Sequence, residues 1–239
     1  MDLYEQPYDP KHPVICFDER PCQLIGDAII PIPIKPGSPK KEHYEYIRNG
    51  TCCVFLAFEP LAGKRLICVK ERRTMVDYAD FMRLLADQYP EAETILLVQD
   101  NLNTHTAGSF YNALPPDDAF QLGRRFEYHY TPKKGSWLNM AEIELSALSK
   151  QCLDRRIADM KRLIDEVSAW EQERNAIGAT VRWRFNKDNA RVKLQRHYSN
   201  LLNWCYRALV VIEMIPLRSI SLPAACSQKG LYMNKSYSD

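Results

Sequence analysis

Three acidic residues stand where their carboxylates could meet in one site. Asp18 ends the apolar run V-I-C-F, Asp100 ends the run I-L-L-V-Q, and Glu142 lies inside the helix-like stretch S-W-L-N-M-A-E-I-E. Carboxylates at contact distance raise one another's pKa, so such a cluster requires a compensating cation. Carboxylate oxygens and water are the ligands that Mg²⁺ and Mn²⁺ prefer. Asp18, Asp100 and Glu142 are therefore candidate ligands of a divalent metal ion.

Strand patterns carry the two aspartates. Residues 14–18 and 94–99 are continuous apolar runs typical of buried strands, and residues 126–130 alternate aromatic and polar side chains. Residues 43–48 and 51–59 flank Asn49-Gly50, the strongest two-residue hairpin signal, so a hairpin is predicted there, followed by a strand at 65–70. The first third of the chain is thus expected to be a run of antiparallel strands, with a Pro-rich loop at 31–39.

Helical patterns separate the later strands. Apolar spacing predicts a helix over residues 74–89, which begins with a capping box formed by Thr74 and Asp77. Further helices are predicted at 106–113, 117–123, 136–150 and 159–175. This order predicts an α/β protein with a mixed sheet covered by helices. Sites in such sheets form beyond the carboxyl ends of strands, where Asp18 and Asp100 lie, and Glu142 would arrive from the next helix.

Helical periodicity alone does not choose between Glu142 and Glu144. Both lie about equally far from the apolar stripe expected to be buried, at ~100° per residue, so the two carboxylates cannot both face one metal site. The stripe consists of Leu138, Ala141, Leu145, Leu148 and Cys152.

Composition describes an ordinary globular protein. The 239 residues carry a formal net charge of +2, and their eight cysteines form no C-x-x-C pair, so reduced thiols in a cytoplasmic protein are expected. No charged-then-apolar leader opens the chain, so export is not predicted. The apolar stretch at 201–217 is interrupted by Arg207 and Glu213, which favours a helix that packs on a partner surface over a membrane span.

Basic residues gather in two segments, 124–134 and 182–196. Such clusters are either a solvated surface or a face that contacts phosphates beside the acidic site. In the first segment the candidate phosphate-contacting residues are Arg124, Arg125, Lys133 and Lys134.

The motifs D-N-L-N-T-H at 100–105, H-Y-T-P-K-K-G-S-W-L-N-M-A-E at 129–142 and F-D-E at 17–19 resemble DDE transposases. They resemble in particular the bacterial insertion-sequence branch of the mariner-like superfamily, from about residue 14 to 198. The resemblance implies a ribonuclease-H-like fold, a mixed five-stranded sheet flanked by helices. It implies the catalytic and metal-binding triad Asp18, Asp100 and Glu142, so it favours Glu142 over Glu144. Asn101 and His105 become supporting residues.

His105 has two interpretations. It could position a water or a phosphate near the metal ions, or it could be a packed histidine bonded to a backbone carbonyl. Glu19 follows Asp18 and would point to the opposite face of a continuing strand, so a structural role is expected for it.

The resemblance also implies a domain plan and partners. Residues 1–13 are an approach segment, 14–198 the catalytic domain, and 199–239 a C-terminal helix with a tail expected to be disordered. Family members carry a helix-turn-helix region that reads transposon ends, whereas this chain starts a dozen residues before its first strand. The expected partners are DNA, both transposon ends and target, and either another copy of the chain or a helix-turn-helix-bearing transposase half. No membrane is involved, and action at the nucleoid is implied.

The implied activity is metal-dependent cleavage of a DNA phosphodiester by water, followed by joining of the freed 3′-OH to target DNA. Asp18 would bridge two Mg²⁺ or Mn²⁺ ions, while Asp100 and Glu142 would each hold one. Lys133, Lys134, Arg124 and Arg125 would contact the DNA backbone. The alternative is an inactive or regulatory transposase remnant that binds DNA or a full-length transposase. A ribonuclease H is disfavoured by the D-N-L-N-T-H segment.

Overall fold

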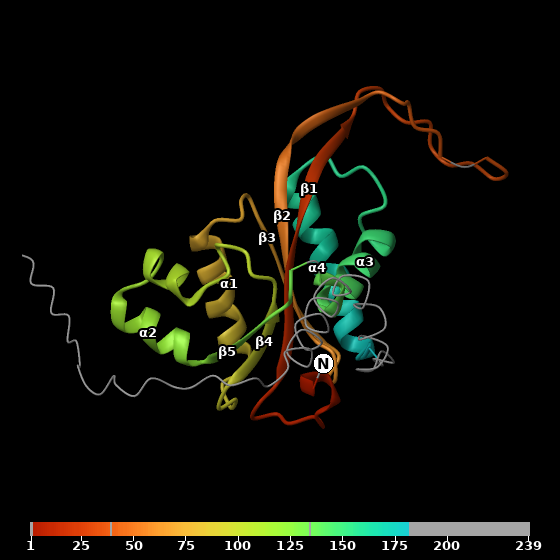
Figure 1. Cartoon of the computed structure of the whole chain (residues 1–239). Helices are drawn as coiled ribbons and strands as arrows, with labels where there is room; N and C mark the ends of the chain where they lie inside the picture. The colour runs from red at the N-terminus through yellow and green to blue at the C-terminus, as the bar shows by residue number, and fades with distance from the viewer. Residues whose placement is uncertain (1, 39, 134, 182–239) are drawn as a thin grey trace, which may run out of the picture. The chain divides into compact units, whose positions relative to one another are not determined.

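The computed structural model describes residues 2–38, 40–133 and 135–181. Five strands and four α-helices follow one another in this part of the chain, together with short 3-10 helices (Figure 1). The strands are β1 (Val14–Asp27), β2 (Tyr46–Glu59), β3 (Lys64–Lys70), β4 (Ile95–Gln99) and β5 (Phe126–Tyr130). The α-helices are α1 (Met75–Gln88), α2 (Pro116–Arg124), α3 (Ala141–Gln151) and α4 (Met160–Ile177). The 3-10 helices are η1 (Asp2–Glu5), η2 (Ala107–Asn112) and η3 (Ser136–Leu138).

The strands form one sheet in the order β3-β2-β1-β4-β5. β1 pairs antiparallel with β2, and β2 antiparallel with β3, whereas β1 with β4 and β4 with β5 are parallel. The predicted fold class, a mixed five-stranded sheet flanked by helices, is therefore confirmed. β1 is the central strand, so it pairs with β2, the next strand in the sequence, and with β4, a strand much later in the chain.

Helices cover both faces of the sheet (Figure 1). On one face, Phe17 and Leu97 pack with α1 and with residues of η2 and α2; on the other, Cys16 and Val98 pack with α3 and α4. Successive side chains of a strand point to opposite faces. This alternation in β1 directs Asp18 toward the α3 side and Glu19 toward the α1 side.

The predicted hairpin at Asn49-Gly50 is wrong. β2 runs without a turn from Tyr46 to Glu59, and its register with β1 shifts at this point, where Leu24 pairs with Gly50 and Ile25 with Arg48. Asn49 is thus the extra residue of a β-bulge, and Gly50 adopts φ +116°. The pairing of β2 with β1 outweighs the local turn preference of Asn49-Gly50. The bulge requires a positive φ at the glycine, the same property that makes Asn-Gly typical of turns.

The helix predictions are confirmed with two refinements. The capping box at α1 is present, since the Thr74 side chain accepts from the backbone N–H of Asp77 and the Asp77 side chain accepts from that of Thr74. Residues 107–112 form a 3-10 helix in place of an α-helix. The helix predicted over 136–150 is divided, because Asn139 is extended (φ −83°, ψ 115°) between η3 and α3.

Several predictions lie outside the described residues. These concern the helix at 201–217, the basic segment at 182–196, the tail from 218, Lys134, and the domain boundary at 198. Within the described ranges, no helix is both long and apolar enough to cross a membrane.

Candidate active site

Asp18 and Asp100 lie beside each other at one edge of the parallel part of the sheet. β1 and β4 pair in register, Val14 with Leu96, Ile15 with Leu97 and Cys16 with Val98. Continuing this register places Asp18 next to Asp100, directly after β4 ends at Gln99. Neighbouring strands lie about 4.8 Å apart, so the two carboxylates can share one ligand.

Asp18 is a partly buried carboxylate in a negatively charged environment. Its Oδ1 accepts a 2.8 Å hydrogen bond from the backbone N–H of Glu19. Burial, foremost, and the charges of Glu19, Asp100 and Glu142 raise the pKa of Asp18 to about 7. The three acids singled out in the sequence are therefore close enough to interact electrostatically.

Asp100 is held by the loop that follows β4. Its Oδ1 lies 2.5 Å from Nδ1 of His105 and accepts a 3.3 Å hydrogen bond from the backbone N–H of Leu102. The hydrogen bond with His105 lowers the pKa of Asp100, against the opposing effect of burial. Oδ1 therefore accepts from both donors of this loop.

His105 is a buried residue between two carboxylates. One ring nitrogen contacts Asp100, and the other, Nε2, lies 2.9 Å from Oε2 of Glu19. Burial alone would lower the pKa of His105, but the hydrogen bond with Asp100 and the charges of Glu19 and Asp100 raise it to about 9. The ring is therefore protonated at neutral pH. The packed-histidine interpretation was right about burial but wrong about the partner, because among the described residues the ring contacts two carboxylates in place of a backbone carbonyl.

Glu142 and Glu144 occupy different environments on α3. Glu142 lies exposed in the first turn of the helix, and its charge reaches Asp18. Glu144 is 1% exposed and makes ion pairs with Arg65 (2.7 Å) and Arg174 (2.8 Å). Glu144 is thereby occupied on the far side of the helix, which leaves Glu142 as the glutamate available to the two aspartates.

Asn139 fixes the start of α3 against the sheet. Its Nδ2 donates to the backbone carbonyl of Phe17 (2.7 Å), and its Oδ1 accepts from the N–H of Ala141 (3.1 Å). A buried amide thus ties the first turn that carries Glu142 to the residue before Asp18. In the sequence this asparagine was only one residue of the motif at 129–142, and no role was predicted for it.

The predicted DNA-contacting residues lie at two different ends of the sheet. Lys133 is exposed and follows the carboxyl end of β5, which is level with the end of β4 because Gln99 pairs with Tyr130. Arg124 and Arg125 precede β5, about 17 Å away along a five-residue strand. Arg125 donates to the backbone carbonyl of Tyr89 (2.6 Å). The structure therefore brings Lys133, but not Arg124 or Arg125, to the edge that carries the acids.

Two further positions complete this edge. Asn101 is exposed directly after Asp100. Arg73, in the loop before α1, has an exposed side chain whose Nη1 lies 3.6 Å from Oε1 of Glu19, and its charge contributes to the lowered pKa of Asp100. Sequence analysis did not predict a role for Arg73. The only signal was the pair of basic residues in E-R-R-T, directly before α1.

The acids fit a hard divalent cation in type and charge. Asp18, Asp100 and Glu142 offer only carboxylate oxygens, and burial first, then the negative charges of Glu19, Asp100 and Glu142, raise the pKa of Asp18. Among the described residues, no three His, Cys, Asp or Glu side chains are drawn together closely enough to bind an ion unaided. Mg²⁺ is usually bound through one or two carboxylates, with water and substrate phosphates completing its shell, so a closed protein cage is not required.

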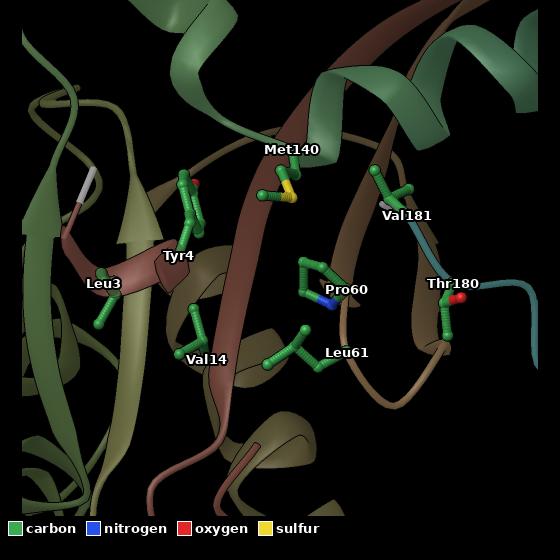
Figure 2. A pocket seen from close by; sticks show the side chains of 8 residues that line it. All are labelled: Leu3, Tyr4, Val14, Pro60, Leu61, Met140, Thr180 and Val181. Atoms are coloured by element: carbon green, nitrogen blue, oxygen red, sulfur yellow. The ribbon is translucent and has the colours of Figure 1, made fainter. Parts of the chain in front are cut away.

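An apolar cavity lies under the start of α3, on the face of the sheet to which Asp18 points (Figure 2). It has a volume of about 260 Å³, and its walls include Tyr4, Val14 and Met140. Tyr4 also donates a 2.9 Å hydrogen bond to the carbonyl of Leu138. None of the three predicted acids lines this cavity, so the cavity is separate from the candidate active site.

Comparison with known proteins agrees with these features. A model of the DDE superfamily endonucleases matches residues 13–164, and no curated protein sequence matches the chain. One similar solved structure is the Mos1 transposase paired-end complex with left transposon end, at 15% identity and a TM-score of 0.48, covering 70% of this chain and 51% of that one. Another is the Mos1 mariner paired end complex with Mn, at 16% identity and a TM-score of 0.49, covering 74% and 54%. The chain thus spans about half the length of these transposase chains.

The matched residues run from just before β1 into α4, so they include Asp18, Asp100 and Glu142 and every strand of the sheet. The match covers well over half of the 239 residues. The chain therefore belongs to the DDE superfamily endonucleases.

Proposed function

We propose that this chain is the catalytic domain of a DNA transposase from the bacterial insertion-sequence branch of its family. It would cleave DNA phosphodiester bonds and join the freed 3′-OH end to target DNA at the nucleoid. The observation that carries the proposal is the position of Asp18 beside Asp100 at the ends of two parallel strands, with the charge of Glu142 in range. Membership of the DDE superfamily endonucleases supports a nucleic-acid substrate.

The three carboxylates would hold Mg²⁺ or Mn²⁺, as two ions. When bound, such ions activate the attacking oxygen and stabilise the leaving one. The chain's own residues orient the carboxylates: the backbone N–H of Glu19 fixes Asp18, His105 fixes Asp100, and Asn139 anchors the turn that carries Glu142. Glu142 is exposed and can therefore adjust its position when DNA arrives.

The DNA backbone would lie along the edge of the sheet that carries the acids. Lys133 and Arg73 are exposed at this edge and would contact phosphates as single charges. Lys134, next to Lys133, would extend this contact. Arg124 and Arg125 would meet only DNA that extends toward the other end of β5. Transposon ends and target are the proposed substrates, with a second copy or a helix-turn-helix-bearing half supplying end recognition.

The test is nicking of supercoiled plasmid in the presence of Mn²⁺ or Mg²⁺. We expect Asp18→Asn and Asp100→Asn to abolish nicking while the circular dichroism spectrum stays unchanged. Asp118→Asn is the matched control, because Asp118 is exposed on α2, which leads into the opposite end of β5. Nicking by Asp100→Asn at the wild-type rate would refute the proposal. Binding of DNA without any metal-dependent cleavage would indicate a regulatory remnant.

A further inference from the structure

Glu19 is a buried carboxylate behind the acidic cluster. It neighbours Asp18 in β1 but points to the α1 side of the sheet, and its side chain is only 4% exposed. A charge buried in this way is strongly destabilising unless another charge compensates it. The groups that compensate Glu19 therefore indicate what it does.

Its two partners are His105 and Arg73. Nε2 of His105 lies 2.9 Å from Oε2 of Glu19, and Nη1 of Arg73 lies 3.6 Å from Oε1. Oε2 is close to His105 but has no well-aligned hydrogen-bond donor, so the contact is an ion pair. The opposite side of the same imidazole contacts Asp100. A continuous row of charges, Glu19 to His105 to Asp100, thus passes from the α1 side of the sheet to the end of β4.

The position of the His105 ring is otherwise set by packing. The ring stacks on Tyr78 with centroids 5.1 Å apart and meets Phe17 edge-on at 5.2 Å. The backbone carbonyl of His105 accepts hydrogen bonds from the side chains of Gln99 (2.9 Å) and Tyr130 (3.2 Å). These contacts confine the plane of the ring, whereas the carboxylate at each nitrogen decides between the two orientations related by a flip about the Cβ–Cγ bond.

We infer that Glu19 is a positioning residue that, through His105, orients the carboxylate of Asp100 beside Asp18. The inference rests on the proposed function, because it assigns Glu19 a part in the same site. Groups that orient a metal-binding carboxylate or histidine from behind typically change metal affinity or activity by about 10–100-fold when they are replaced. Glu19 touches neither substrate nor metal in this role, and its effect must pass through His105.

The test uses the full chain and four variants: Glu19→Gln, His105→Gln, the double variant, and Glu59→Gln as a matched control. Glu59 is likewise a buried glutamate in the sheet, 1% exposed and bonded to Tyr89, but the acid cluster does not involve it. The measurements are the plasmid nicking rate at saturating Mn²⁺, the Mn²⁺ Kd from calorimetry, and the Tm. We expect Glu19→Gln to lower the rate and weaken Mn²⁺ binding by about 10–100-fold, and Glu59→Gln to change only the Tm.

The double variant separates the proposed route from a direct role of Glu19. If Glu19 acts through His105, the double variant is no slower than His105→Gln, whereas independent effects would multiply. Multiplying effects, or a wild-type rate and Kd in Glu19→Gln, would overturn the inference. If Glu19→Gln does not fold, Glu19→Asp replaces it, because this variant keeps the charge but shortens the side chain. An unchanged nicking rate in Glu19→Asp would also overturn the inference. If Asp18→Asn loses activity while Glu19→Gln nicks DNA at the wild-type rate, the inference about Glu19 fails but the proposed function stands.

Discussion

The carboxylate of Glu144 is buried against the guanidinium of Arg65, with Oε2 2.7 Å from Nε. Both side chains are almost completely excluded from solvent, and Arg174 donates to the same carboxylate. This group of charges joins α3, β3 and α4. It also distinguishes the two glutamates at the start of α3, since Glu144 pairs with arginines of β3 and α4 whereas Glu142 is exposed.

The first prediction concerns this buried ion pair. Glu144→Gln leaves the Arg65 guanidinium buried without a counter-charge, and we expect it to lower the free energy of unfolding by about 3–5 kcal/mol. Glu142→Gln, an exposed change on the same helix, should alter it by less than about 0.5 kcal/mol. Urea unfolding at neutral pH measures both. Similar stabilities of the two variants would contradict the division of roles.

A second prediction concerns Glu171, on α4. Burial raises its pKa from 4.5, although its Oε1 accepts a 3.0 Å hydrogen bond from the backbone N–H of Ile67. When the pKa of a carboxyl is higher in the folded than in the unfolded protein, the protein loses stability as the pH rises from 4.5 through the pKa of the folded state. Glu171→Gln retains an acceptor without the charge, so its Tm should exceed that of the wild type at pH 7.5.

The pH dependence distinguishes this effect from a general gain in packing. Below pH 4.5 the carboxyl is protonated in both states, so the Tm difference between Glu171→Gln and wild type should vanish there. Glu173→Gln, an exposed change on α4, is the control and should show no such trend. A difference that is constant from pH 4 to 8 would mean that ionisation is not the cause.

A third prediction follows from the β-bulge. Gly50 has φ +116°, a conformation that is strained for any residue with a Cβ, although no atom would block one there. Gly50→Ala should therefore cost about 1–3 kcal/mol of stability. Gly108→Ala, where the new Cβ would meet only the Thr106 hydroxyl at 3.5 Å, should be neutral or stabilise by up to about 1 kcal/mol. Denaturant midpoints compare them, and equal midpoints would argue against the bulge.

A fourth prediction concerns Arg73 as a DNA contact. Each phosphate contact contributes about 0.9 to the slope of log K against log salt, so Arg73→Gln should weaken binding and reduce that slope by about 0.9. Arg83→Gln is the control, because its side chain is as exposed (55%, against 56% for Arg73) but lies further along α1. Fluorescence anisotropy with a short duplex at several salt concentrations measures both. An unaltered slope in Arg73→Gln would remove Arg73 from the binding surface.

The parts of the fold that sequence predicted are those set by local pattern. The runs of β1 and β4 are apolar enough to be buried on both faces, and their parallel ends bring Asp18 and Asp100 to one edge wherever the strands are neighbours. The Thr74 cap was recognisable because its partner is three residues away. At Asn49-Gly50 the local preference misled, because pairing with a strand some 25 residues earlier decided the conformation.

The finer features of the site depend on contacts that are distant in the chain. Periodicity could not separate Glu142 from Glu144, because the deciding arginines lie 79 and 30 residues from Glu144. Strand alternation correctly placed Glu19 on the face opposite Asp18. It gave no sign that His105 would turn back from the loop after β4 and link the two faces.

The central position of β1 has a consequence for synthesis of the chain. Its antiparallel partner β2 emerges from the ribosome soon after it, but β4 begins only at Ile95, long after β1 ends at Asp27. At about 5–20 residues per second, one side of β1 waits on the order of 10 s for its neighbour. During this interval the apolar residues Ile15 and Phe17 border an open row of amides and carbonyls, the template on which strands of other chains assemble. We therefore expect the nascent chain to be prone to strand-to-strand association until β4 is made.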